Sequence, residues 1–298
     1  MSPAASDRTC RQLIQWAAKQ MDAANLYFGH GTDNAQDEAA FLVLRSLQLP
    51  LDIEDALLDQ PVSGERRQAV INAVNERIAT RKPAAYILGE CWFAGLRFYV
   101  NEHVLVPRSP VAELILDRFT PWCREDGVKR VLDIGTGSGC IAIACAMAFP
   151  AATVDAIDIS PEALAVAQRN VENYGLPGRV TLIESDLFQK LAGRRYDLII
   201  ANPPYVDAED FAAMPPEYRH EPAIGLRAGM DGLEIVRRIL ASAGKYLTDS
   251  GVLVVEVGNS ETALTDQYPQ VLFLWLEFER GGAGVFLLTR QELDRFFP

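Results

Sequence analysis

The sequence lacks the long apolar run, the paired cysteines and the spaced histidines that mark several classes of protein. Among its 298 residues, no apolar stretch approaches the roughly 20 residues of a membrane-spanning helix. Residues 1–12 have neither the basic nor the apolar region of a signal peptide, so we expect a soluble, cytoplasmic protein. The five cysteines form no CxxC pair, and the three histidines lie far apart, so we expect reduced thiols and no metal site.

Basic residues are also in deficit, and the formal net charge is −12. An extended nucleic-acid surface needs clustered Lys and Arg, which argues against that class of partner. An acidic protein is suited to a basic partner through electrostatic complementarity, although many enzymes are acidic for solubility alone.

The first part of the chain has the pattern of amphipathic helices. Apolar residues recur at intervals of three and four in the segments 10–28, 35–47 and 64–81. The stretch 91–107 is instead aromatic and β-branched with a glycine break, which indicates a β-hairpin. We therefore expect a helical domain over 1–88, a β-hairpin linker over 89–110 and a third region over 111–298.

The third region alternates strands and helices. Strands are predicted at 130–135, 153–159, 179–187, 196–202, 251–258 and 285–290, and helices at 140–148, 161–175 and 233–247. Such alternation predicts an α/β domain in which helices cover both faces of a mostly parallel sheet.

A glycine-rich turn, "DIGTGSGC" (133–140), joins the first of these strands to a helix. Its glycines allow close approach of the backbone to a ligand, and the helix N-terminus offers N–H groups and a positive dipole end. A dinucleotide fingerprint needs GxGxxG, but here the third glycine comes one residue early and Cys140 takes its place. The GxGxG form favours S-adenosylmethionine over NAD.

Two acidic residues follow the next strands. Asp158 ends the second strand, where a carboxylate can accept hydrogen bonds from both hydroxyls of a ribose. Asp186 ends the third strand, where it can face an adenine edge while Leu187 packs on the ring. Each residue alone could be a helix cap or part of a turn, but their order in one chain favours a nucleoside-containing cofactor.

The fourth strand stops abruptly at Asn202-Pro203-Pro204-Tyr205. Two prolines fix two φ angles and remove two backbone donors, which leaves a stiff segment with exposed carbonyls. The nitrogen of a planar amide is a poor nucleophile because its lone pair is delocalised. Asn202 Oδ1 and the Pro203 carbonyl can accept its two hydrogens and orient it, while Tyr205 packs on its flat face.

This corner resembles the signature of class I methyltransferases that act on planar nitrogen, and the whole chain resembles the protein glutamine N(5)-methyltransferases. That family modifies release factors and one ribosomal protein. The segments 89–115, 221–233 and 278–289 are most similar to the branch that modifies large-subunit ribosomal protein number three. The release-factor branch typically has "PRPETE" after the hairpin, where this chain has Ser109-Pro110-Val111.

The resemblance implies a Rossmann-like domain with a seven-stranded sheet, preceded by a helical domain. From the position of that helical domain in the chain, we expect it to select the substrate. It implies S-adenosylmethionine as cofactor, S-adenosylhomocysteine as product, no metal, and a basic ribosomal protein as partner before or during ribosome assembly. The residues that it assigns to the cofactor, together with those inferred above, are Asp133, Gly135, Thr136, Gly137, Ser138, Gly139, Asp158, Asp186, Leu187 and Asn202. It assigns Asn202, Pro203, Pro204 and Tyr205 to the substrate. The segment "AIGLRAG" departs from the more usual "ALALRAG" outside this corner.

Alternatives remain open at the level of the sequence. A release factor could be the substrate, and a nucleic-acid amino methyltransferase would share the corner because adenine presents the same planar NH₂. Residues 1–90 hold nine basic and twelve acidic side chains, which does not suit nucleic acid. An NAD-dependent oxidoreductase fits the glycine loop less well, because Cys140 stands in place of the third glycine. A protein that only binds the cofactor fits less well with an intact Asn202 and Tyr205 in the corner.

Overall fold

The computed structural model describes residues 8–124 and 126–298, which form two compact units. The first unit extends to Cys91 and also contains Pro215–His220. The second consists of Trp92–Met214 and Glu221–Pro298. Within the described ranges, no helix is long and apolar enough to span a membrane.

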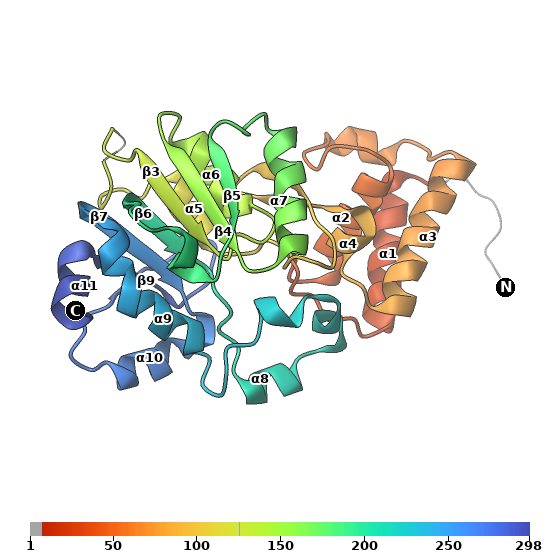
Figure 1. The fold of residues 1–298 in the computed structure, drawn as a ribbon. Helices are drawn as coiled ribbons and strands as arrows, with labels where there is room; N and C mark the ends of the chain where they lie inside the picture. The colour runs from red at the N-terminus through yellow and green to blue at the C-terminus, as the bar shows by residue number, and fades with distance from the viewer. Residues whose placement is uncertain (1–7, 125) are drawn as a thin grey trace. The chain divides into compact units, whose positions relative to one another are not determined.

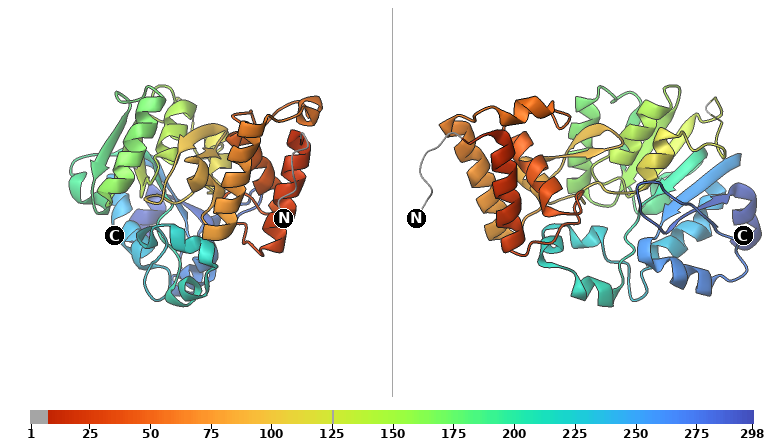
Figure 2. Two further views of the ribbon diagram at one scale, coloured as in Figure 1. Left: turned by 90° about the vertical axis from the view of Figure 1, so that its right-hand side faces the viewer. Right: turned by 180° about the vertical axis from the view of Figure 1, so that it is seen from behind.

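In the first unit, the helices α1 (Cys10–Ala23), α2 (Ala35–Ser46) and α3 (Gly64–Thr80) run side by side, as Figures 1 and 2 show. Side chains cap the first two of these helices. The Thr9 side chain accepts a hydrogen bond from the backbone N of Gln12, and the Asn34 side chain accepts one from the backbone N of Asp37. Their apolar faces bury a core that includes Leu13, Met21 and Val74. The helical elements are α1 (Cys10–Ala23), α2 (Ala35–Ser46), η1 (Asp55–Asp59), α3 (Gly64–Thr80) and α4 (Ala84–Leu88).

The segment Pro215–His220 belongs to this helical unit although it follows the candidate corner in the chain. Glu217 is fully buried, and its Oε1 lies 2.8 Å from Nη2 of Arg81 and 3.0 Å from the backbone N of Tyr27. His220 Nε2 lies 2.9 Å from the carbonyl of Thr80. A buried carboxylate needs such partners, which is why this segment stays with the helices rather than with the residues around it in sequence.

The hairpin is shorter than the predicted linker. Its strands β1 (Glu90–Phe93) and β2 (Leu96–Tyr99) are joined by Ala94-Gly95, both with positive φ, as a type I′ turn requires. Residues 100–110 contain no strand. The division between the two units falls inside β1.

The second unit is built on the predicted seven-stranded sheet, with strand order β5-β4-β3-β6-β7-β9-β8. Among these strands, Figure 1 labels β3 to β7 and β9. The first five strands in that order are parallel, and β9 runs antiparallel to both of its neighbours. The strands are β3 (Arg130–Ile134), β4 (Thr153–Asp158), β5 (Val180–Glu184), β6 (Tyr196–Ala201), β7 (Leu247–Glu256), β8 (Leu274–Trp275) and β9 (Val285–Thr289). A mostly parallel sheet of this kind is the α/β architecture that the sequence predicts.

Helices cover both faces of the sheet. Leu132 and Ile134 of β3 share an apolar cluster with residues of α9, α10 and α11. Asp133 alternates with them and points to the other face, where the backbone N of Ala142 in α6 donates to it. The helices of this unit are α5 (Val111–Leu116), α6 (Cys140–Ala148), α7 (Pro161–Asn173), α8 (Ala208–Ala213), α9 (Glu234–Ala243), α10 (Glu261–Gln267) and α11 (Arg290–Phe296).

Candidate active site

The glycine turn lies between β3 and α6, as the sequence predicts. Gly135, Gly137 and Gly139 have φ values of +71°, +53° and +79°, a conformation that other residues adopt only with strain. Gly139 also packs closely, since a Cβ there would lie 3.2 Å from the Cβ of Ala167. A Cβ on Gly137 would meet nothing within 4 Å, so the turn presents open space at that point.

Asp133 lies buried beneath this turn. Its Oδ2 accepts from Thr136 Oγ1 at 2.5 Å and from Ala142 N at 3.1 Å. Its Oδ1 is buried and has no hydrogen-bond partner among the described residues. Burial raises the pKa of this carboxyl to about 7, although the hydrogen bonds from Thr136 and Ala142 act in the opposite direction. The orphaned oxygen is an acceptor that a cationic ligand group could satisfy.

Asp158, at the end of β4, ties the turn to the next helix. Its Oδ2 accepts from Gly137 N and its Oδ1 from Ser160 N, both at 2.9 Å. Burial raises the pKa of this carboxyl above its ordinary value, and the backbone donors oppose the shift. Each carboxylate oxygen can accept more than one hydrogen bond, so ribose hydroxyls remain compatible with this arrangement.

Asp186 is already paired. Both of its carboxylate oxygens lie 2.7 Å from Nη2 of Arg238 in α9, an interaction that the sequence did not reveal. Leu187 has a φ of +48° and packs partly buried against the core, and its carbonyl accepts from Ser185 Oγ at 2.8 Å. If Asp186 contacts the adenine, its carboxylate does so while it is paired with Arg238.

The Asn-Pro-Pro-Tyr corner follows β6, the neighbour of β3 in the sheet. The two motifs meet there, because a Cβ on Gly135 would lie 3.9 Å from the carbonyl oxygen of Asn202. Pro203 is buried, whereas Asn202, Pro204 and Tyr205 are half-buried. The next residue, Val206, exchanges backbone hydrogen bonds with Leu226 and Ala228, which fixes the exit of the corner.

The sequence analysis did not identify two residues of the site: Glu256, which contacts the corner, and Ser109, which contacts Glu256. Glu256, the last residue of β7, accepts from Tyr205 Oη at 3.0 Å and from Ser109 Oγ at 2.5 Å. A single glutamate inside the apolar run "VLVVEV" was the available signal, because a buried carboxylate needs polar partners. The identity of those partners was not available from the pattern.

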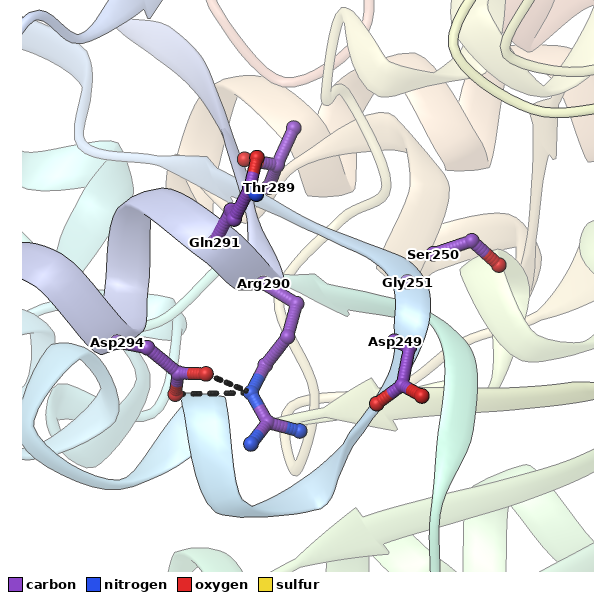
Figure 3. A pocket seen from close by; sticks show the side chains of 7 residues that line it. All are labelled: Asp249, Ser250, Gly251, Thr289, Arg290, Gln291 and Asp294. Carbon is purple, nitrogen blue, oxygen red and sulfur yellow. Dashed lines mark hydrogen bonds and ion pairs between the residues drawn. The ribbon is translucent and has the colours of Figure 1, made fainter.

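A polar pocket elsewhere on the second unit is shown in Figure 3. It lies beside the start of β7 and the start of α11, at the opposite end of the parallel strands from the glycine turn. Arg290 within it is held by Asp294 at 2.7 Å. Ligands of open α/β sheets bind at the carboxyl ends of the strands, so the site is assigned to the glycine turn and the corner.

Comparison with known proteins identifies the fold and the family of this chain. The family model described as methyltransferase small domain matches residues 112–214 of this chain. The catalytic domain of hMettl16, solved in complex with MAT2A 3'UTR hairpin 1, is similar in fold with a TM-score of 0.53. The match has 16% identity and covers 83% of this chain and 88% of that one.

Two curated relatives match almost end to end. The ribosomal protein uL3 glutamine methyltransferase of Francisella tularensis is 47% identical over 97% of this chain and 92% of its own length. The protein of the same name from Bordetella pertussis is 47% identical over 96% of this chain and 97% of its own. The chain thus belongs to the family of ribosomal protein uL3 glutamine methyltransferases.

Proposed function

We propose that this enzyme transfers a methyl group from S-adenosylmethionine to the side-chain amide nitrogen of a glutamine in ribosomal protein uL3. The observation that carries the proposal is the near full-length similarity to the uL3 methyltransferases, in a chain that keeps the Asn-Pro-Pro-Tyr corner beside the glycine turn. A uL3 substrate would locate the reaction in the cytoplasm, before or during ribosome assembly.

The residues around the glycine turn fit the cofactor. The open space at Gly137 can admit the methionine part, and the orphaned Oδ1 of Asp133 can accept from its cationic amino group. Asp158 is assigned to the ribose, and Leu187, with Asp186 beside it, to the adenine. When bound, S-adenosylmethionine supplies a methyl group that its positively charged sulfur has already activated.

The corner would hold and orient the substrate amide. Asn202 Oδ1 and the Pro203 carbonyl are the two acceptors assigned to its NH₂ group, and Pro204 keeps that segment stiff. Tyr205 is assigned to the flat face of the amide. Alignment and avoided reorganisation can contribute roughly 7–11 kcal/mol in favourable cases, so no strong general base is required.

We also propose that the helical unit selects the substrate. The excess of acidic over basic side chains in residues 1–90, twelve against nine, suits a basic ribosomal protein, and Pro215–His220, ten residues beyond Tyr205, is anchored in that unit by Glu217. Electrostatic complementarity of this kind steers association and favours the correct partner.

The experiment offers purified uL3 and a purified release factor, each with labelled S-adenosylmethionine, to the wild-type enzyme and to Asn202→Ala. We expect methylglutamine in uL3 by mass spectrometry, and strongly reduced label with the variant. Preferential labelling of the release factor would reassign the substrate, and label in added ribosomal RNA would refute protein methylation.

A further inference from the structure

Glu256 is a buried carboxylate at the carboxyl end of β7, and it is only 5% exposed. An ionised carboxyl in an apolar surrounding is unfavourable unless donors compensate it. Each of its two oxygens accepts a hydrogen bond from a hydroxyl group, one from Tyr205 and the other from Ser109. Burial raises the pKa of this group, while both hydroxyl donors favour the ionised form.

Tyr205 is fixed at three points by residues from the end of β7 onward. Its hydroxyl donates to Glu256, and its carbonyl accepts from Ser260 Oγ at 2.9 Å. Its ring packs on Gly258, where a Cβ would lie 2.5 Å from Cε2 of the tyrosine. The side chain of Tyr205 therefore has little freedom once these contacts are made.

Ser109 is itself held rigidly, so it can fix the orientation of Glu256. Its Oγ accepts from the backbone N of Val111 at 3.2 Å while it donates to Glu256. The preceding Arg108 makes two hydrogen bonds to Glu221, at 2.7 and 2.8 Å. Ser109, Glu256 and Tyr205 thus form a continuous chain of hydrogen bonds from a fixed backbone segment to the corner.

We propose that Glu256 is a positioning residue for methyl transfer, and this inference rests on the function proposed above. Ser109 orients this carboxylate, which accepts a hydrogen bond from the hydroxyl of Tyr205. That hydrogen bond fixes the plane of the ring that packs on the substrate amide. The Pro203 carbonyl lies in the same stiff segment, and the Asn202 side chain that carries Oδ1 extends from it, so the placement of both acceptors toward the reacting nitrogen depends on that segment. Glu256 acts through Tyr205 and not by contact with the substrate.

A double-mutant cycle tests this role with four proteins: wild type, Tyr205→Phe, Glu256→Ala and the double variant. Single-turnover methyl transfer is measured on whichever of uL3 and the release factor the wild type methylates. We expect each single variant to lower the rate between about 10-fold and 100-fold, since a displacement of about 1 Å at a reacting centre can have that effect. The double variant should be little slower than either single variant, because both break the same contact.

Glu256→Gln is the matched control. Its amide oxygen can still accept from Tyr205, and its NH₂ group can donate to Ser109 Oγ, so we expect a rate within about 3-fold of wild type. Cofactor affinity, measured by calorimetry, should be unchanged in all variants. If Glu256 served folding alone, its replacement by alanine would lower the active fraction equally with and without the Tyr205→Phe substitution, so the two effects would multiply.

Multiplying effects in the double variant, or a wild-type rate for Glu256→Ala, would overturn the positioning role. Failure of the wild type to methylate uL3 would instead refute the proposed substrate, and the cycle on the release factor would still decide the role of Glu256. Thermal unfolding of the four proteins, which needs no substrate, independently reports whether the Tyr205–Glu256 contact contributes to stability.

Discussion

The glycine turn and the Asn-Pro-Pro-Tyr corner follow adjacent strands, but different kinds of contact hold them. The turn is stabilised within a short span of sequence: Asp133 binds Thr136, and Gly137 donates to Asp158, 21 residues away. The corner depends on distant residues, because Tyr205 and Glu256 are 51 residues apart and Ser109 and Glu256 are 147 apart. The glycine turn of the cofactor half is thus locally encoded, although Asp186 in the same half pairs with the distant Arg238, whereas the corner that forms the substrate half is assembled by the fold.

The largest effect is expected at the corner itself. Asn202→Ala removes one of the two acceptors assigned to the amide, so we expect kcat to fall by about 10²-fold or more. Cofactor affinity should change much less, because the side-chain oxygen of Asn202 is assigned to the substrate amide. Asn202→Asp keeps an acceptor oxygen and should retain partial activity. Single-turnover rates and calorimetric binding for both variants check this, and a near wild-type rate for Asn202→Ala would mean that the corner is only a stiff turn.

Asp158→Ala tests the cofactor half. The variant removes a charged acceptor assigned to the ribose and also releases the backbone N of Gly137, so affinity for S-adenosylmethionine should weaken by about 1.5–3 kcal/mol. Calorimetry measures this directly. A folded variant with unchanged affinity would remove Asp158 from the site, and equal losses in kcat and affinity would break the separation between the two halves.

Gly258→Ala tests whether the corner depends on distant packing. The new methyl group would collide with the Tyr205 ring, and the φ of +48° would add strain, so we expect a loss of about 1–3 kcal/mol in stability together with slower turnover. Gly193→Ala is the matched control, because its φ is +76° but a Cβ there meets nothing within 4 Å. Denaturant unfolding and turnover are measured for both variants. Normal turnover by Gly258→Ala would contradict the proposal that distant residues hold Tyr205 in place.

The last test concerns the pH dependence of stability in the absence of cofactor. The pKa of Asp133 is about 7 in the folded protein, compared with about 3.9 in an unfolded chain. The folded state therefore favours the protonated form, and the stability that this contributes is complete below about pH 4 and is lost as pH rises through about 7.

Asp133→Asn stays neutral and keeps an acceptor for Thr136 and Ala142. Wild type should therefore lose stability relative to this variant between about pH 5 and pH 8. Denaturant unfolding at both pH values measures the difference. The raised pKa of Glu256 affects both proteins alike and cancels in the comparison, whereas Asp158 is coupled to Asp133 and forms part of the difference. An unchanged difference would mean that Asp133 is not titrating in this range.

Local pattern was sufficient wherever periodicity or backbone restriction dictates structure. The predicted helix over 140–148 is α6 to the residue, and the predicted strands coincide with β3, β4 and β6 to within one residue at either end. The prediction of β5 ran beyond its C-terminus, since Asp186 and Leu187 leave the strand for a turn fixed by Ser185. The two-residue strand β8 was missed because it is too short to show any alternation.

Three features could be predicted from the sequence alone: the α/β alternation, the glycine turn and the stiff corner. Each rests on hydrophobic periodicity, on φ restriction or on contacts among near neighbours. Three others became visible only in the fold: the pairing of Arg238 with Asp186, the place of Glu217 among the helices, and the hold of Ser109 and Glu256 on Tyr205. Those contacts join residues far apart in the chain. No local pattern encodes which buried charge finds which partner, since that choice depends on how strands and loops are brought together when the apolar core is buried.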